Sequence, residues 1–246
     1  MKTSRSLVCG TCAALCSFAL LTGSALAASP AVESALEKIG SKRGVICLAG
    51  VPGKNAVFVT DLAKASELVV FVQAPTLETA NAVRRLAEKG NLLGTRVFVA
   101  TGMERIHLAD NVADGVLVAD GSKISEAEFL RVLRPRAAAF IGNQTIVKPV
   151  PEGFDDWSHP FHRADNNPQS KDQFVRGRFR TQFIATPKFS PMPEQTVIAG
   201  GRMYKAMGHI SHKENQNMNL NTLLCINAYN GTILWKRPLP EGFMIH

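Results

Sequence analysis

Five short apolar runs, separated by segments with helical periodicity, are the feature that most constrains this chain. The runs are Val45–Ala49, Leu68–Val72, Arg96–Ala100, Gly115–Ala119 and Ala137–Ile141. Runs that are apolar at nearly every position indicate strands buried on both faces, with helices between them as cover. The pattern therefore predicts an α/β fold over residues 28–148, built on a doubly wound sheet of parallel strands.

The segments between the runs carry the start and stop residues of helices, such as proline in the first turn and glycine after the last. The expected helices cover about residues 30–38, 54–65 and 76–89, and a segment that begins at Ser125. Ligands of doubly wound sheets bind at the carboxyl ends of the strands. The residues that directly follow each apolar run are therefore the candidates for a functional site.

Residues 1–27 have the composition of a secretory signal peptide. Lys2 and Arg5 precede an apolar run over residues 7–21, and Ala25 and Ala27 fit an A-x-A cleavage site. The run is short for a membrane span, so an uncleaved anchor is the weaker alternative. We expect a periplasmic or otherwise exported protein with no transmembrane segment in the mature chain.

Three of the five cysteines lie in that leader, which leaves Cys47 and Cys225. Both lie in apolar, strand-like runs, which favours buried free thiols over a disulfide. The net charge of +8 is spread as +2, +3 and +3 over residues 1–27, 28–148 and 149–246. No part is basic enough to predict nucleic-acid binding.

The segment Glu128–Pro135 resembles the E-x-x-R-V-L-R-P-G-G motif of Rossmann-like S-adenosylmethionine-dependent methyltransferases. The run from Gly94 to Gly102, followed by Asp110 and Asp114, also keeps that family's order. The resemblance covers about half of the chain. It implies a Rossmann-like sheet with a cofactor site at the ends of the first strands.

The positions that hold the cofactor in that family are altered here. Cys47 replaces an acidic residue, Ala49 and Val51 replace glycines, Gln73 replaces the acid that binds the ribose, Met103 replaces the acid after Gly102, and Arg136-Ala137 replaces a glycine pair. What remains is a degenerate set of cofactor-binding candidates: Gly50, Gly53, Gln73 and Gly102. S-adenosylmethionine is also a cytosolic cofactor. We therefore expect no cofactor, with S-adenosylmethionine or pyrroloquinoline quinone as the alternatives.

Residues 149–192 are polar, rich in aromatics and poor in Leu and Val, which predicts an irregular linker or clasp. His159 and His162 are weak metal-ligand candidates, but His159 precedes a proline and so cannot share a helix face with His162. We expect hydrogen-bonded loop histidines and no metal site; His209 and His212 are treated the same way. Arg176, Arg178 and Arg180 indicate an exposed strand edge or a domain contact.

Residues 193–246 have the pattern of antiparallel hairpins, the first of them turning at Gly200-Gly201. Ala228, Gly231 and Trp235 resemble the repeat of pyrroloquinoline-quinone-type β-propellers. The repeat implies a positive φ at Gly231 and a Trp235 side chain packed between blades. It also implies the first blade of an incomplete, truncated propeller, as in large exported propeller proteins of planctomycete-type bacteria.

These observations favour a non-catalytic, exported binding or scaffold protein. Its partners would be the rest of the propeller or other exported proteins, and no catalytic residue stands out. Two enzymes are the alternatives: an S-adenosylmethionine-dependent methyltransferase, and a quinoprotein dehydrogenase-like activity in a full-length protein.

Overall fold

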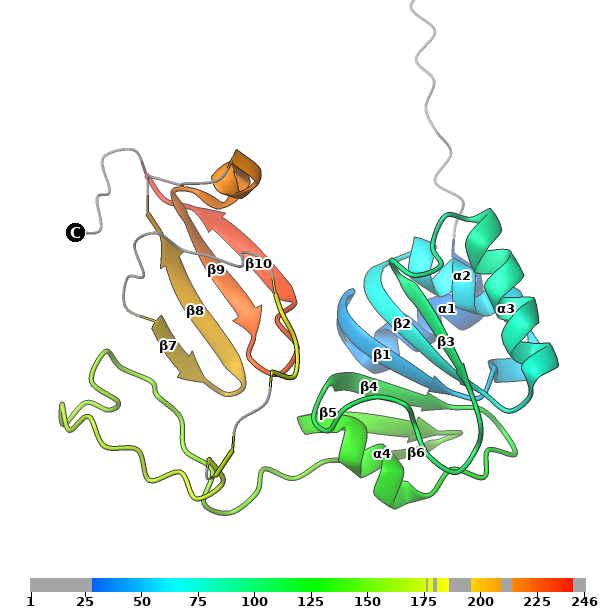
Figure 1. Ribbon diagram of the computed structural model, residues 1–246, viewed down its shortest axis with the longest axis horizontal. Helices are drawn as coiled ribbons and strands as arrows, with labels where there is room; N and C mark the ends of the chain where they lie inside the picture. Colours follow the sequence, from blue (N-terminus) through cyan, green and yellow to red (C-terminus); the bar gives the residue numbers. More distant parts are fainter. Residues whose placement is uncertain (1–27, 176, 179–180, 186–195, 209–213, 241–246) are drawn as a thin grey trace, which may run out of the picture.

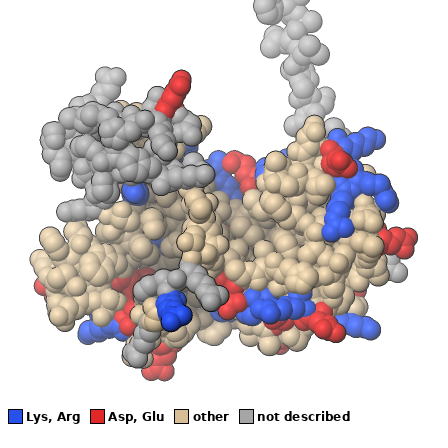
Figure 2. Space-filling view, viewed as in Figure 1, with Lys and Arg blue, Asp and Glu red and all other residues tan. Residues whose placement is uncertain are grey.

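The computed structural model describes residues 28–175, 177–178, 181–185, 196–208 and 214–240. The predicted leader over residues 1–27 lies outside the described residues, as do Arg176, Arg180, His209 and His212. No helix in the described ranges is long and apolar enough to cross a membrane. The strands of the described residues form two separate sheets (Figure 1). On the face that Figure 2 shows, basic and acidic side chains lie interspersed.

The first sheet has six strands in the order β3-β2-β1-β4-β5-β6. The strands are β1 (Arg43–Ala49), β2 (Glu67–Ala74), β3 (Val97–Thr101), β4 (Ala113–Val118), β5 (Leu133–Ile141) and β6 (Gln144–Val147). Strands β1 to β5 pair in parallel, and β6 is antiparallel to β5. The predicted doubly wound sheet is confirmed, and its strand order reverses between β1 and β4, where such sheets bind ligands.

Helices cover both faces of this sheet. They are α1 (Pro30–Ile39), α2 (Ala56–Lys64), α3 (Leu77–Lys89) and α4 (Glu126–Val132), with a short 3₁₀ turn η1 (Pro52–Lys54) before α2. One core lies between the sheet and α1 to α3, and the other lies under α4 and the β3–β4 loop (Figure 1). In β1, Ile46 and Leu48 enter the first core, whereas Cys47 and Ala49 enter the second. This alternation explains why the strand is apolar throughout.

Side-chain caps fix the starts of three helices. Asn55 Oδ1 accepts from the Val57 amide at 3.0 Å, and Thr76 Oγ1 accepts from the Thr79 amide at 3.2 Å. Ser125 caps α4, as its capping-box spacing predicts. These hydrogen bonds satisfy amide groups that a helix leaves unpaired at its first turn.

The end of the first sheet differs from the prediction. Strand β5 begins at Leu133, four residues before the predicted start, and the edge strand β6 was not predicted. Arg136 lies within β5 with a φ of 68°, next to a register shift against β4. The first residues of β5, Leu133–Arg136, include two arginines and a proline, a composition that is more typical of a turn than of a strand.

The second sheet is a four-stranded antiparallel meander in the order β10-β9-β8-β7. Its strands are β7 (Thr196–Ala199), β8 (Arg202–Met207), β9 (Thr222–Asn227) and β10 (Ile233–Pro238), with a 3₁₀ segment η2 (Glu214–Asn219) before β9. Both predicted hairpins are confirmed. One sheet of this kind does not show a propeller, so only the antiparallel sheet is established.

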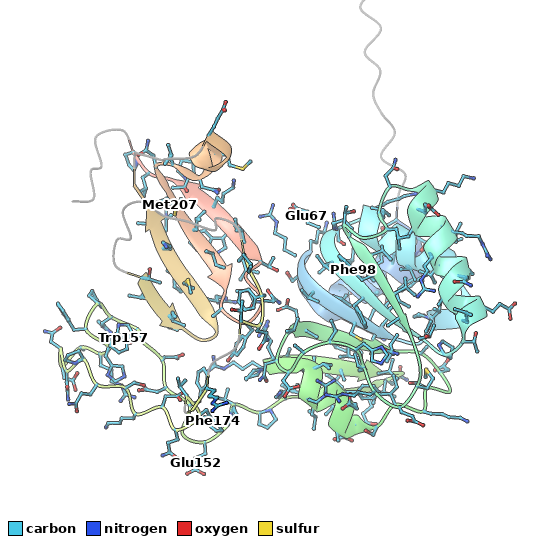
Figure 3. The ribbon with its side chains drawn as sticks, in the orientation of Figure 1. Glu67, Phe98, Glu152, Trp157, Phe174 and Met207 are labelled. Atoms are coloured by element: carbon cyan, nitrogen blue, oxygen red, sulfur yellow. The ribbon has the colours of Figure 1, made fainter. Side chains whose placement is uncertain are left out.

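The segment between the sheets has turns and isolated bridges in its described part. Trp157 pairs with Ile198 of β7, which ties the segment to the second sheet. Trp157 and Phe174 lie on this segment, and Met207 lies on the second sheet (Figure 3).

Candidate functional site

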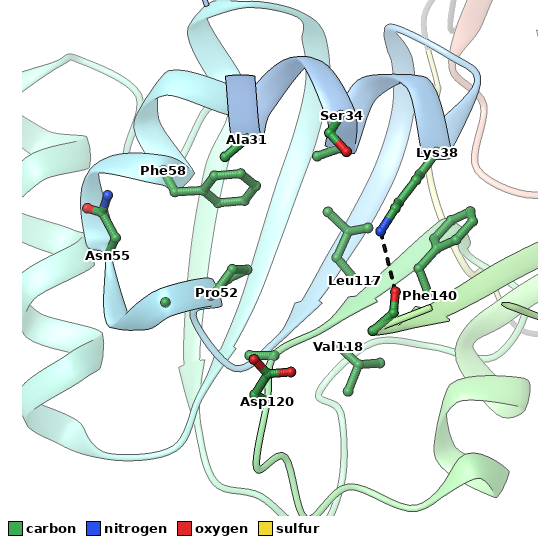
Figure 4. Close-up of a pocket in the computed structure, with 14 residues that line it drawn as sticks. Ala31, Ser34, Lys38, Pro52, Asn55, Phe58, Leu117, Val118, Asp120 and Phe140 are labelled. Atoms are coloured by element: carbon green, nitrogen blue, oxygen red, sulfur yellow. Dashed lines mark hydrogen bonds between the residues drawn. The ribbon is translucent and has the colours of Figure 1, made fainter. Parts of the chain in front are cut away.

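A cavity of about 540 Å³ lies where the strand order reverses (Figure 4). Its walls come from α1, from the turn that follows β1, and from the carboxyl ends of β4 and β5. We call it the switch-point cavity. Its size falls within the range of about 300–1,000 Å³ that is usual for small-molecule sites.

Two glycines shape the turn after β1. Gly50 has a φ of 94°, and a Cβ atom on it would lie 2.8 Å from the Cβ atom of Ala119. Only glycine lets β1 and β4 end this close together. Gly53 has a φ of 59° and lines the cavity, with no atom within 4 Å of a Cβ placed on it. The chain is thus open to a ligand at Gly53.

The cavity presents one cation and one carboxylate. Lys38 of α1 donates a hydrogen bond to the Gly142 carbonyl oxygen at 3.4 Å, a long contact drawn in Figure 4. Asp120 lies two residues after the end of β4 and makes no hydrogen bond or ion pair with any residue that the structure describes. Phe58 and Phe140 supply aromatic walls. The arrangement suits a ligand that carries both charges and an apolar part.

Gln73 does not face this cavity. It is fully buried, its Nε2 atom donates to the Gly102 carbonyl oxygen at 2.7 Å, and its Oε1 atom accepts from the His107 amide at 3.0 Å. The amide therefore holds the end of β2 to the loop after β3. Because both of its ends are bonded within the protein, Gln73 does not suit the ribose-binding role implied by the resemblance.

The four predicted cofactor-binding residues thus separate into two groups. Gly53 lines the switch-point cavity and Gly50 shapes its turn, whereas Gln73 and Gly102 bond to each other at the end of β2. The analysis of the sequence missed Lys38 and Asp120. Asp120 follows the fourth apolar run, so the rule of strand ends could have found it. No local pattern shows that Lys38 of α1 reaches the same place.

The motif behind the resemblance has a structural role. Arg131 contacts Glu128 at 2.8 Å and Asp110 at 2.6 Å, and it donates to the carbonyl oxygens of Ile106 and Leu108. The Arg131 guanidinium holds the pKa of Glu128 below its usual value. The E-x-x-R pair therefore anchors the β3–β4 loop to α4.

The remaining candidates are held within the protein. His162 contacts Asp155 at 2.7 Å through Nε2 and the Asn167 carbonyl oxygen at 3.2 Å through Nδ1, and His159 Nδ1 contacts Ser158. The described residues contain no group of three or more His, Cys, Asp or Glu side chains that could hold a metal.

Cys47 and Cys225 are buried free thiols, as predicted. Burial raises the pKa of each, which disfavours the reactive thiolate.

The propeller-type residues fit their predicted places in part. Gly231 has a φ of 74°, as the repeat implies. Trp235 is 41% exposed, and its ring lies 6.1 Å from that of Tyr204. The described residues contain one antiparallel sheet, so no second blade lies against Trp235, and the implied packing between two blades is not found.

No protein-family model matches the chain, and no curated protein matches it. Solved structures match its first domain. A putative S-adenosyl-L-methionine-dependent methyltransferase from Methanococcus maripaludis is 21% identical, with a TM-score of 0.39, over 46% of this chain and 53% of that one. A SAM-dependent methyltransferase from Aquifex aeolicus is 22% identical, with a TM-score of 0.35, over 44% and 61%.

A third match is geranyl diphosphate C-methyltransferase from Streptomyces coelicolor A3(2), solved with S-adenosyl-L-homocysteine. It is 11% identical, with a TM-score of 0.39, over 44% of this chain and 43% of that one. The matched part of this chain thus spans between two fifths and two thirds of these proteins. The class that the fold defines is a Rossmann-like α/β domain, followed here by an antiparallel sheet.

These neighbours contradict two predictions. A non-catalytic scaffold was the favoured function and no cofactor was expected, but the matched proteins are named as S-adenosylmethionine-dependent methyltransferases. Those predictions rested on the altered glycines and acids of the cofactor positions and on the expected export, and they did not consider Lys38 and Asp120. The neighbours share the fold with this chain; by themselves they assign it no cofactor.

Proposed function

We propose that the first domain binds S-adenosylmethionine in the switch-point cavity and acts as a methyltransferase. The observation that carries the proposal is that Lys38 and Asp120 both line a cavity of about 540 Å³ at the reversal of strand order. S-adenosylmethionine carries a carboxylate, an ammonium group and a sulfonium, beside a flat apolar base. Lys38 complements the carboxylate, and Asp120 complements the two positive groups.

Each lining residue has a role in this proposal. Lys38 would hold the carboxylate of the cofactor, and Asp120 would lie against its positive groups. The rings of Phe58 and Phe140 would stabilise the sulfonium or the adenine by cation–π and stacking contacts. Gly53 would let the ligand approach the main chain closely.

The residues present fit the cofactor by charge and volume at this cavity. They do not fit it at Gln73, because both ends of its side-chain amide are already hydrogen-bonded within the protein. When bound, the cofactor supplies a methyl carbon attached to a positively charged sulfur. The protein would orient that group: Lys38 and Asp120 fix the two charged ends, and the phenyl rings exclude water from between them. Because the entropy of orienting the reactants is lost on binding, this arrangement lowers the barrier to group transfer.

Variants of the full chain test the proposal through ligand-induced thermal shifts. We expect Asp120→Asn to weaken S-adenosylmethionine binding at least tenfold, about 1.4 kcal/mol. The matched control is Glu88→Gln, which removes an exposed carboxylate from α3 and should leave the affinity unchanged. Equal affinities in both variants would overturn the assignment of the cavity.

We also propose that the four strands β7 to β10 form a propeller-type blade. Their sequential antiparallel order and the positive φ of Gly231 support it. Sequencing the coding DNA beyond codon 246 tests it. In-frame Ala-x-x-Gly-x-x-x-Trp repeats are expected, and unrelated sequence would contradict the proposal.

A further inference from the structure

A second cavity of about 800 Å³ lies between the two sheets, at the opposite edge of the first sheet from the switch-point cavity. Its first wall is formed by the starts of β1 and β5 and the turn before β1. The second wall is formed by the β7–β8 turn and by β10. We call it the inter-sheet cleft. Five basic side chains and one acidic side chain line it: Lys42, Arg43, Arg134, Arg136, Arg202 and Asp114.

Asp114 is fully occupied by the fold. Its Oδ1 atom accepts from Arg134 Nε and Asn227 Nδ2, and its Oδ2 atom accepts from the Val45 amide and Asn230 Nδ2. The side chain is only 7% exposed. Asp114 and Arg134 therefore cancel each other's charge, and the carboxylate ties the second sheet to the first.

Arg43 is also paired. It contacts Glu67 at 2.6 Å and donates to the Leu234 carbonyl oxygen at 3.3 Å. Glu67 lies at the edge of the first sheet that faces the second (Figure 3). Neither Arg43 nor Arg134 thus contributes an uncompensated positive charge to the cleft.

Three cations remain: Lys42, Arg136 and Arg202. All three are exposed, and none makes an ion pair or side-chain hydrogen bond within the described part of the chain. Asp156, whose Oδ2 atom accepts from the Gly200 amide at 3.1 Å, is a neighbouring carboxylate. Even with Asp156 counted, the cleft keeps a surplus of two positive charges.

Arg136 stands where glycine would be easier to accommodate. Its φ of 68° lies in the left-handed region, which favours glycine. The methyltransferase motif that this segment resembles has glycine there. The chain thus places a guanidinium group in the cleft at a position where its backbone disfavours a side chain.

Trp235 adds a flat apolar surface to the same cleft. It is 41% exposed and lines the cavity together with Leu234. Aromatic rings beside cations bind molecules that combine a planar or apolar body with an anionic group.

We propose that the inter-sheet cleft binds a small organic ester of phosphate or sulfate. Its tetrahedral oxyanion would lie among Lys42, Arg136 and Arg202, and its body would lie against Trp235. An arginine guanidinium can donate two parallel hydrogen bonds to two oxygens of such a group. The cleft has the volume of a small-molecule site, and a surplus of two charges is small for a nucleic-acid interface. The ligand is therefore a small molecule.

Titration calorimetry of phenyl phosphate and phenyl sulfate into the full chain tests this proposal, with phenol as the uncharged probe. We expect one site for at least one ester and none for phenol. Tighter binding of the phosphate identifies phosphate esters as the ligand class, and tighter binding of the sulfate identifies sulfate esters. Absence of binding by both esters overturns the proposal.

Variants locate the site. Arg136→Gly removes the cation and suits the backbone φ, so the chain should stay folded while its affinity falls at least tenfold. Arg202→Gln should weaken binding in the same direction. Arg85→Gln, which changes an exposed side chain of α3, is the matched control and should leave the affinity unchanged. Equal weakening by Arg85→Gln would reveal only general attraction of anions, and would overturn the cleft as the site.

Discussion

Gln73 shows how one buried side chain sets what the end of a strand can bind. Its amide bonds to Gly102 and to the His107 amide, so the place where the resemblance puts a ribose ligand is used to hold a loop. The switch-point cavity then depends on other residues, Lys38 and Asp120. A change of role at a single position thus moves the proposed cofactor contacts from β2 toward β4.

Replacing Gln73 tests this structural role. Gln73→Leu leaves the Gly102 carbonyl oxygen and the His107 amide without their partner, and we expect the free energy of unfolding to fall by about 1–3 kcal/mol. Urea denaturation measures the change. S-adenosylmethionine affinity should stay within twofold of the original. A large loss of affinity with unchanged stability would return Gln73 to the ligand site.

At the scale of elements, the apolar runs and caps predicted most of the first sheet. Continuous burial on two faces leaves a clear pattern in β1, β2 and β4. The edge strand β6 has only four residues, mostly exposed, so it leaves none. The proposed site was less predictable: Asp120 follows a strand end, but Lys38 reaches the cavity only through the packing of α1 beside β4. The local periodicity of a sequence does not predict contacts between elements that are far apart in the chain.

Asp155 is the hydrogen-bonding centre of the segment between the sheets. This carboxylate accepts hydrogen bonds from the Lys171 amide, Ser170, His162 and Arg163. The Lys171 amide and the Arg163 guanidinium hold the pKa of Asp155 well below its usual range. The carboxylate contacts therefore stabilise the fold above the unfolded-state pKa of about 3.9, and this contribution is lost as pH falls toward the lower folded pKa.

An Asp155→Asn variant tests that dependence. We expect it to unfold more easily than the original chain at pH 7, with the difference shrinking as the pH falls below about 4. In that range Asp155 of the original chain takes up a proton when the chain is unfolded but stays ionised when it is folded, so unfolding becomes more favourable as the pH falls. Urea denaturation at several pH values measures this. Glu88→Gln serves as the control. A difference that stays constant from pH 7 to acid would refute the charge-based account of this segment.

At the scale of the whole molecule, Asp114 joins the two sheets. Asn227 and Asn230 of the second sheet domain meet it from one side, and Val45 and Arg134 meet it from the other. The second sheet alone has a small core around Met207, Leu224 and Ile226. The junction is thus a main source of its stability.

Removing this carboxylate should uncouple the sheets. We expect Asp114→Ala to cost about 3–5 kcal/mol, because the partly buried Arg134 guanidinium loses its counter-charge and three amide donors lose this acceptor. Thermal unfolding should then show an earlier transition for the second sheet. Glu67→Gln, at the exposed ion pair with Arg43, should cost at most about 1 kcal/mol. Equal effects of the two substitutions would contradict the central place of Asp114.

The predicted leader determines in which cell compartment the chain would bind the proposed cofactor. Cleavage after Ala27 would give a mature chain that begins at Ala28, and intact-mass measurement of the protein from separated cell fractions tests this. An exported chain meets S-adenosylmethionine before it leaves the cytosol, so bound cofactor is expected in the uncleaved form. A protein that keeps Met1 in every fraction would contradict export.

Titration calorimetry of S-adenosylmethionine into the unaltered full chain tests the central claim most directly. The account predicts one site with a micromolar Kd, about −8 kcal/mol. It also predicts weaker binding of S-adenosylhomocysteine, which lacks the sulfonium charge that Asp120 and the phenyl rings attract. A chain that circular dichroism shows to be folded, but that binds neither compound, would contradict the assignment of the switch-point cavity as a methyl-donor site.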